Sequence, residues 1–248
     1  MNALSNIKTI AKRELGAYFS SPVAYVFIVI FLLLVGFFTF MIGGFFERRE
    51  ASLKDSFFVW HPWLYLFLVP AVAMRVWSEE RRLGTMVLLL SMPITPWQAI
   101  VGKFLASWLF LALALVLTFP VVWTVNSLGD ADNGVIFCGY VGSLLLAGAY
   151  LAIGCMTSAM TRNQVISFVL SVVICLFLIL AGWPPVTNLL VRWANPWLVD
   201  LVAAFSVMSH FEGFQRGVLD SRDIVFFLSV IGFPLFVTGV ILRGLRSG

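Results

Sequence analysis

The chain has 248 residues, of which 61% are hydrophobic and only 11% are charged. Soluble globular domains carry about 25% charged residues, so this composition excludes an ordinary soluble domain and indicates a membrane protein. The formal net charge of +4 comes from Lys and Arg residues concentrated near the ends of apolar runs. Charge in such places sets topology and contacts anionic lipid, so we expect membrane lipid, and not nucleic acid, as its partner.

The first predicted element is an interfacial helix within residues 1–21. Apolar residues recur at spacings of three and four over residues 4–19, whereas Lys8, Lys12 and Arg13 are basic. That period is typical of an amphipathic helix lying in the inner membrane interface. The alternative is a basic flank that only anchors topology.

Six apolar runs follow, each long enough for a transmembrane helix, which needs about 20 mostly apolar residues. They are residues 23–46, 57–76, 104–125, 135–160, 165–183 and 224–242. Apart from Arg75 at the end of the second, these runs contain no Asp, Glu, Lys or Arg. The predicted fold is therefore an all-α membrane protein with six transmembrane helices in a single domain, residues 1–248, with spans one to five in residues 22–183 and the sixth with a tail in 224–248.

Basic residues divide unequally between the two sides of the membrane that these runs define. With the N-terminus inside, ten Lys and Arg residues would lie in cytoplasmic segments and six in outer segments. Cytoplasmic loops carry the excess of Lys and Arg, so both termini are expected in the cytoplasm.

The connection between the second and third runs, residues 78–95, reads SEERRLGTMVLLLSMPIT, and we call it the elbow. Ser78 can cap a helix, and Glu79 and Glu80 suit the positive end of the helix dipole. Gly84 indicates a turn. We therefore expect a short helix lying across the inner face between two spans.

A second short helix is expected after that turn. Thr85 can cap it, and prolines end it. Its apolar residues, 86–90, must be covered by lipid, by neighbouring spans or by a partner protein. Lys103, at the start of the third run, is expected to snorkel to the interface. Alternatively, Arg81 and Arg82 are only topology signals that the two glutamates before them neutralise.

The connection over residues 184–223 is long but apolar, and prolines divide it into pieces too short to span a membrane. We expect an outer re-entrant hairpin of one or two helices that dip into the outer leaflet. A seventh span over residues 197–211 is the alternative, but its length and its Asp200 and His210 argue against it.

Several chemistries are missing from the sequence. The runs contain no acidic residue for an ion relay, and Gly102-Lys103 lacks the glycine and the Ser or Thr of a phosphate-binding loop. His61 and His210 are expected to be polar residues near the outer interface rather than catalytic bases. The chain is therefore expected to be neither an enzyme nor a self-powered transporter. The three cysteines, Cys138, Cys155 and Cys175, are expected to be buried, with no metal site.

At the elbow the sequence resembles the type-two ABC export permeases, with the gliding-motility (GldF-like) branch nearest. The shared residues are Glu79-Glu80-Arg81-Arg82-x-Gly84-Thr85, Leu88-Leu89-Leu90-x-x-Pro93, Gly102-Lys103, Ser21-Pro22-x-Ala24-Tyr25, Pro62-Trp63-Leu64, Pro70-Ala71, Met74-Arg75, His210-Phe211-Glu212-x-Phe214-x-Arg216-Gly217 and Asp220-x-Arg222-Asp223. Copper-maturation permeases related to nitrous oxide reductase share the elbow motif. Val87 stands where family members often have an acidic residue, so contact at this elbow would depend more on its shape and on the four charged residues before it.

This resemblance implies a permease subunit of the bacterial inner membrane with no cofactor of its own. A cytoplasmic ABC ATPase subunit would bind ATP and magnesium, and a second permease copy or paralogue would complete the transporter, with a periplasmic auxiliary protein outside. The elbow residues implied to contact the ATPase are Glu79, Glu80, Arg81, Arg82, Gly84, Thr85, Leu88, Leu89 and Pro93. The residues implied in the outer hairpin are His210, Glu212, Arg216, Asp220 and Arg222.

The sequence alone is compatible with three functions. The subunit exports or extracts a substrate, for which an apolar or amphipathic molecule fits the uncharged spans better than a free ion. It transmits ATPase motion to a periplasmic partner without transport. It is a passive membrane anchor.

Overall fold

The computed structural model describes residues 3–48, 52–86, 94–193 and 195–246, and within these ranges it consists of helices and their connections, with no strand. The helices are α1 (Ala3–Phe19), α2 (Pro22–Phe37), the π-helix η1 (Phe38–Ile42), α3 (Phe45–Arg48), the 3-10 helix η2 (Phe58–Trp60), α4 (His61–Ala73), α5 (Ser78–Leu83), α7 (Pro96–Val116), α8 (Phe119–Leu128), α9 (Asn133–Met160), α10 (Gln164–Leu180), α11 (Pro184–Trp193), α12 (Pro196–Ala204), α13 (Val207–Gln215) and α14 (Ser221–Arg246). The prediction of an all-helical membrane protein is confirmed.

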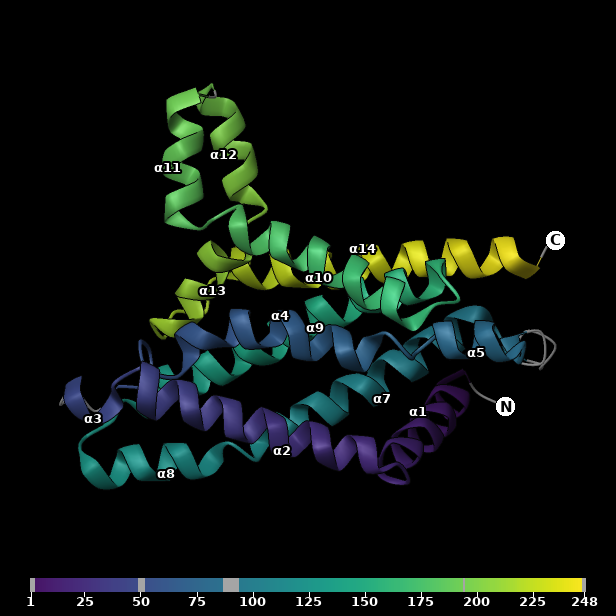
Figure 1. The fold of residues 1–248 in the computed structure, drawn as a ribbon, viewed down its shortest axis with the longest axis horizontal. Helices are drawn as coiled ribbons and strands as arrows, with labels where there is room; N and C mark the ends of the chain where they lie inside the picture. The colour runs from purple at the N-terminus through teal and green to yellow at the C-terminus, as the bar shows by residue number, and fades with distance from the viewer. Residues whose placement is uncertain (1–2, 49–51, 87–93, 194, 247–248) are drawn as a thin grey trace.

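Most helices run along one long axis, and both termini lie at the same end (Figure 1). We call the end that holds α1, α5 and both termini the elbow end, and the end that holds α3 and α13 the far end. Two termini at one end agree with an even number of crossings.

Among the described residues, five helical segments are long and apolar enough to cross a membrane: Pro22–Glu47, Phe58–Leu83, Pro96–Leu128, Asn133–Met160 and Ser221–Gly244. A sixth crossing results if α10 and α11, which meet at a 69° bend, are taken as one span. The predicted fifth run, residues 165–183, corresponds to α10 and the start of that bend. The structure therefore supports five or six spans.

The centre of the bundle is α9, the most buried of these spans, which contacts α4, α7, α10, α13 and α14. Small residues allow this close packing. A Cβ on Gly154 would lie 2.2 Å from Cβ of Ala73 in α4, and one on Gly139 would lie 2.5 Å from the ring of Phe58. The small residues of α9 therefore face its neighbours, as expected for a membrane helix pair.

The third span begins earlier than the apolar run suggested. Thr95 forms a capping box with Gln98, and Pro96 occupies the first turn of α7. Lys103 consequently lies two turns inside the helix instead of at its start. A break follows before α8, where Pro120 lies in the first turn.

The region predicted as one outer hairpin, residues 184–223, divides into two parts. The pair α11 and α12 projects sideways from the bundle, whereas α13 packs against α9 (Figure 1). Phe211 and Phe214 of α13 are fully buried. Moreover, α14 begins at Ser221 and includes the last residues of the predicted hairpin. The apolar side chains of α13 complete the bundle core, whereas the entry of this region into the outer leaflet stays a prediction.

Candidate functional site

The first helix of the elbow forms where predicted, but its cap comes from another span. The backbone N–H groups of Trp77 and Ser78 donate to Oγ of Ser158 in α9 at 3.0 and 2.9 Å. Ser158 in turn donates to the carbonyl of Met74 at 2.9 Å. Ser78 is therefore not the cap, since its own hydroxyl also bonds Met74. Gly84, at φ +73°, ends the helix in the left-handed conformation that glycine adopts without strain.

The side chains of the four charged elbow residues do not all point the same way. Glu80 and Arg81 bond to neighbouring helices: Oε1 of Glu80 pairs with Lys103, and the Arg81 guanidinium donates to the carbonyl of Ala159 in α9. Arg82 is exposed. The quartet thus splits into a part that joins the elbow to the bundle and a part that faces outward.

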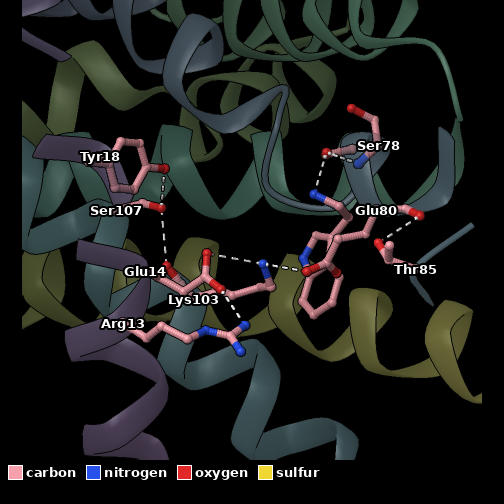
Figure 2. A network of polar contacts seen from close by, with 10 residues as sticks. Arg13, Glu14, Tyr18, Ser78, Glu80, Thr85, Lys103 and Ser107 are labelled. Carbon is pink, nitrogen blue, oxygen red and sulfur yellow. Dashed lines mark hydrogen bonds and ion pairs between the residues drawn. The ribbon is translucent and has the colours of Figure 1, made fainter. Parts of the chain in front are cut away.

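Lys103 is the centre of a charge cluster that the sequence analysis did not predict. Its Nζ lies 2.9 Å from Oε1 of Glu80 and 3.2 Å from Oε2 of Glu14, and its side chain is only 6% exposed (Figure 2). Its Nζ also lies 5.4 Å from the ring centroid of Trp77. The expectation that Lys103 snorkels is wrong, because α1 packs across α7 and covers the route to water.

This cluster joins α1, α5 and α7, and within the part of the chain that the structure describes it contains an unsatisfied atom. Glu14 also pairs with the exposed Arg13 at 3.1 Å. Oε2 of Glu80 is buried and has no hydrogen-bond partner. Since buried carboxylate oxygens are nearly always bonded, this atom would gain a hydrogen bond if the Glu80 carboxylate turned toward the cavity described below.

The amphipathic pattern of α1 is confirmed, and its apolar face covers α7. Ile10 packs on Gly102 so closely that a Cβ there would lie 2.8 Å from the isoleucine side chain. Tyr18 and Ser107 share a hydrogen bond at 2.8 Å. The basic residues predicted for this helix, Lys8, Lys12 and Arg13, are exposed on its other side.

A cavity of about 490 Å³ lies beside the charge cluster, between α1, α2, α4 and α7. Its lining includes the charged residues Glu14, Glu80 and Lys103 and the aromatic residues Phe27 and Phe110. Pockets of this size, with apolar walls and a few polar groups, are typical of small-molecule sites.

The remaining elbow residues are only partly described. Thr85 is exposed, and its hydroxyl lies 3.5 Å from the carbonyl of Glu80. Leu88, Leu89 and Pro93, together with Val87 and the predicted second helix, lie outside the described residues.

At the far end, the predicted hairpin residues form local contacts. Nδ1 of His210 lies 2.7 Å from Oδ1 of Asp223, and its Nε2 lies 3.3 Å from the carbonyl of Ala204 at the end of α12. Glu212 and Arg216 form an exposed ion pair one turn apart on α13. In addition, Asp220 accepts a hydrogen bond from the N–H of Arg222 at 2.9 Å and so caps α14.

His61 differs from its expected place at the interface. It is fully buried at the start of α4, with Nδ1 2.9 Å from Oγ of Ser143, and its ring lies 4.6 Å from that of Phe57. The three cysteines are buried and unpaired, as expected. Among the described residues, no group of His, Cys, Asp and Glu could hold a metal ion.

The chain was compared with known proteins and protein families. No curated protein matches it. A family model described as "ABC-2 family transporter protein" matches residues 50–208, which is more than half of the chain and includes the elbow and α7 to α12. The chain therefore belongs to the ABC-2 transporter family, whose membrane component lacks a nucleotide-binding domain and implies a partner ATP-binding subunit.

Proposed function

We propose that this chain is a permease subunit that couples ATP hydrolysis on a separate ATPase, which binds ATP and magnesium, to export or extraction of a substrate. The observation that supports this most is the double attachment of α5. Glu80 joins it to Lys103 on α7, and Arg81 joins it to Ala159 on α9. A force applied to the elbow therefore reaches two spans directly.

The geometry also suggests which face of the elbow meets the ATPase. Arg82 is exposed and Glu79 is half-buried, whereas Glu80 and Arg81 are engaged inside the bundle. Outward residues would contact the ATPase, and inward residues would transmit the displacement to α7 and α9. Rigid helices moving as bodies are a common way to propagate such a change.

In the arrangement that we propose, the elbow end faces the cytoplasm, the membrane is the bacterial inner membrane, and a second copy or a paralogue completes the permease. The excess of basic residues on that side supports this orientation. Membership in the gliding-motility (GldF-like) branch rests on the sequence resemblance. The substrate is apolar or amphipathic, since the faces of the spans are mainly apolar.

Charge reversal on the outward face tests this proposal. Arg82→Glu should abolish co-purification with the cognate ATPase and its stimulation by the permease, because the contact face reverses its charge. Arg222→Glu, an equally exposed substitution at the far end, is the matched control and should leave both unchanged. Full stimulation by the Arg82→Glu variant would contradict the assignment of the elbow.

A substitution on the face of α5 that contacts the bundle should impair coupling and leave ATPase binding intact. Arg81→Met removes the hydrogen bond to Ala159 while leaving Arg82 in place. The ATPase should still co-purify, but substrate movement per ATP hydrolysed should fall. Loss of ATPase binding with intact coupling in the bound fraction would reverse the proposed roles of the two arginines.

A second candidate function, transmission of ATPase motion to a periplasmic protein without transport, is favoured by the projecting pair α11 and α12. Leu189, Trp197 and Leu201 are at least half exposed on that pair. Deleting residues 184–205 should then abolish partner binding while ATPase stimulation persists. Substrate movement in purified vesicles without any periplasmic protein would instead favour transport.

A further inference from the structure

We propose that the cavity beside α1 binds an amphiphile with an ammonium head group. The head group would donate to Glu80, and the hydrocarbon chain would lie along the aromatic residues of the lining. The proposal concerns a ligand of the single subunit and does not depend on ATPase coupling.

The shape and lining of the cavity favour an amphiphile. The lining includes the charged residues Glu14, Glu80 and Lys103 and the aromatic residues Phe27 and Phe110, whose ring centroids are 5.4 Å apart. A volume of about 490 Å³ is large enough for a small ligand. A molecule with one polar end and one apolar chain would match both kinds of residue.

The charge of the lining favours a cation. Three glutamates, Glu14, Glu79 and Glu80, face two basic residues, Arg75 and Lys103, which gives a formal charge of −1. Arg75 is exposed and therefore solvated. An anionic head group would have to displace a carboxylate from the buried ammonium of Lys103, which already contacts two.

One atom distinguishes an ammonium from other cations. Among the described residues, Oε2 of Glu80 has no hydrogen-bond partner, whereas Oε1 of the same group is used by Lys103. Oε2 is closed to water as the side chains stand, so the head group reaches it when the Glu80 carboxylate turns toward the cavity that this residue lines. A primary ammonium offers three N–H donors, and a trimethylammonium offers none. Hydrogen bonds to a buried charged group are stronger than neutral ones, so the donor should matter as well as the charge.

Exposed residues at the rim give the ligand a way in. Ala17 of α1, Val23 of α2 and Arg75 beyond α4 all line the cavity and are exposed. The opening therefore lies beside the turn between α1 and α2. An amphiphile could enter there with its head group close to the charge cluster.

The test measures binding of three single-chain probes to the purified full chain in a non-ionic detergent, by native mass spectrometry. Dodecylamine should bind about tenfold or more tightly than dodecyltrimethylammonium, and dodecyl sulfate should bind weakest. Glu80→Gln should remove most of the preference for the amine. Glu212→Gln, at the far end, is the control that should keep it.

A second variant guards against a folding defect at Glu80. Ala17→Trp adds an indole at the exposed rim and should reduce binding of every probe while the thermal unfolding curve stays unchanged. Stronger binding of dodecyl sulfate, equal binding of the two cations, or full binding by Ala17→Trp would each overturn the proposal.

The same measurement separates two sources of the head group. An ethanolamine-headed lipid that co-purifies with the wild-type chain and is lost from Ala17→Trp would identify a membrane lipid as the ligand. Tight dodecylamine binding without any co-purified ethanolamine-headed lipid would favour a free single-chain amine as the source of the head group.

Discussion

The two ends of the bundle hold their charges in different ways. At the elbow end, the buried Lys103 connects Glu14 and Glu80, which come from two other helices. At the far end, Glu212 and Arg216 form an exposed pair one turn apart on a single helix. The first arrangement exists only when three segments have packed together, whereas the second requires one turn of helix. The Lys103 cluster should therefore contribute far more to the tertiary structure than the Glu212–Arg216 pair does.

The largest effect is expected for Lys103→Met. Removing the cation leaves two carboxylates facing each other, each about one-fifth exposed, and should destabilise the protein by roughly 3 kcal/mol. Arg216→Met, in the exposed pair, should cost at most about 0.5 kcal/mol. Denaturation in mixed micelles, monitored by circular dichroism, measures both.

A triple variant makes this prediction sharper. Replacing Glu14 and Glu80 with Gln in the Lys103→Met background removes all three charges, and stability should largely return. If the triple variant is as unstable as the single one, packing of the lysine stem, and not its charge, stabilises this end.

Close helix packing provides the next comparison. Gly154→Ala places a Cβ 2.2 Å from Cβ of Ala73, so α9 and α4 must move apart, at a cost of about 2 kcal/mol. Gly232→Ala in α14 meets nothing within 4 Å and should stabilise that helix by up to about 1 kcal/mol. Thermal unfolding of the two variants should therefore shift in opposite directions, and a shift in the same direction would contradict the packing assigned to α9.

The contact between His210 and Asp223 should contribute less to the free energy of unfolding than the Lys103 cluster does. His210→Phe keeps a ring to stack on Phe226 but leaves Asp223 without its partner, at a cost of about 1.5 kcal/mol. Because His210 also contacts the end of α12, amide exchange should accelerate in α11 and α12 and stay slow in α9. Uniform acceleration across the bundle would show that this contact supports the global fold.

Features that depend on composition and period could be predicted from the sequence. The apolar spans, the amphipathic α1 and the turn at Gly84 follow from local patterns, and the structure contains each of them. Even the bend after α10 agrees with the prolines that begin α11.

Features that depend on distant partners could not be predicted. The cap of α5 comes from Ser158, 80 residues beyond Ser78, and no local pattern connects them. Likewise, the burial of Lys103 required knowing that α1 covers α7. The sequence did not predict the packing of α13 in the core, because a short apolar helix has the same sequence pattern at a membrane interface and inside a bundle.

A smaller effect than that of His210→Phe is expected for Gly84→Ala, and a glycine at the far end provides the comparison. Gly84 and Gly217 both have positive φ, at +73° and +79°. A Cβ on Gly84 meets nothing within 4 Å, so its substitution should cost only the backbone strain, about 1 kcal/mol. A Cβ on Gly217 would lie 2.8 Å from the side chain of Val135, so Gly217→Ala should cost more.

Gly84→Asn separates backbone strain from other causes, because asparagine tolerates the left-handed conformation better than alanine. Its loss of stability should be smaller than that of Gly84→Ala in the same denaturation experiment. Equal losses for the two substitutions would contradict backbone strain as the physical reason for glycine at this position of the elbow.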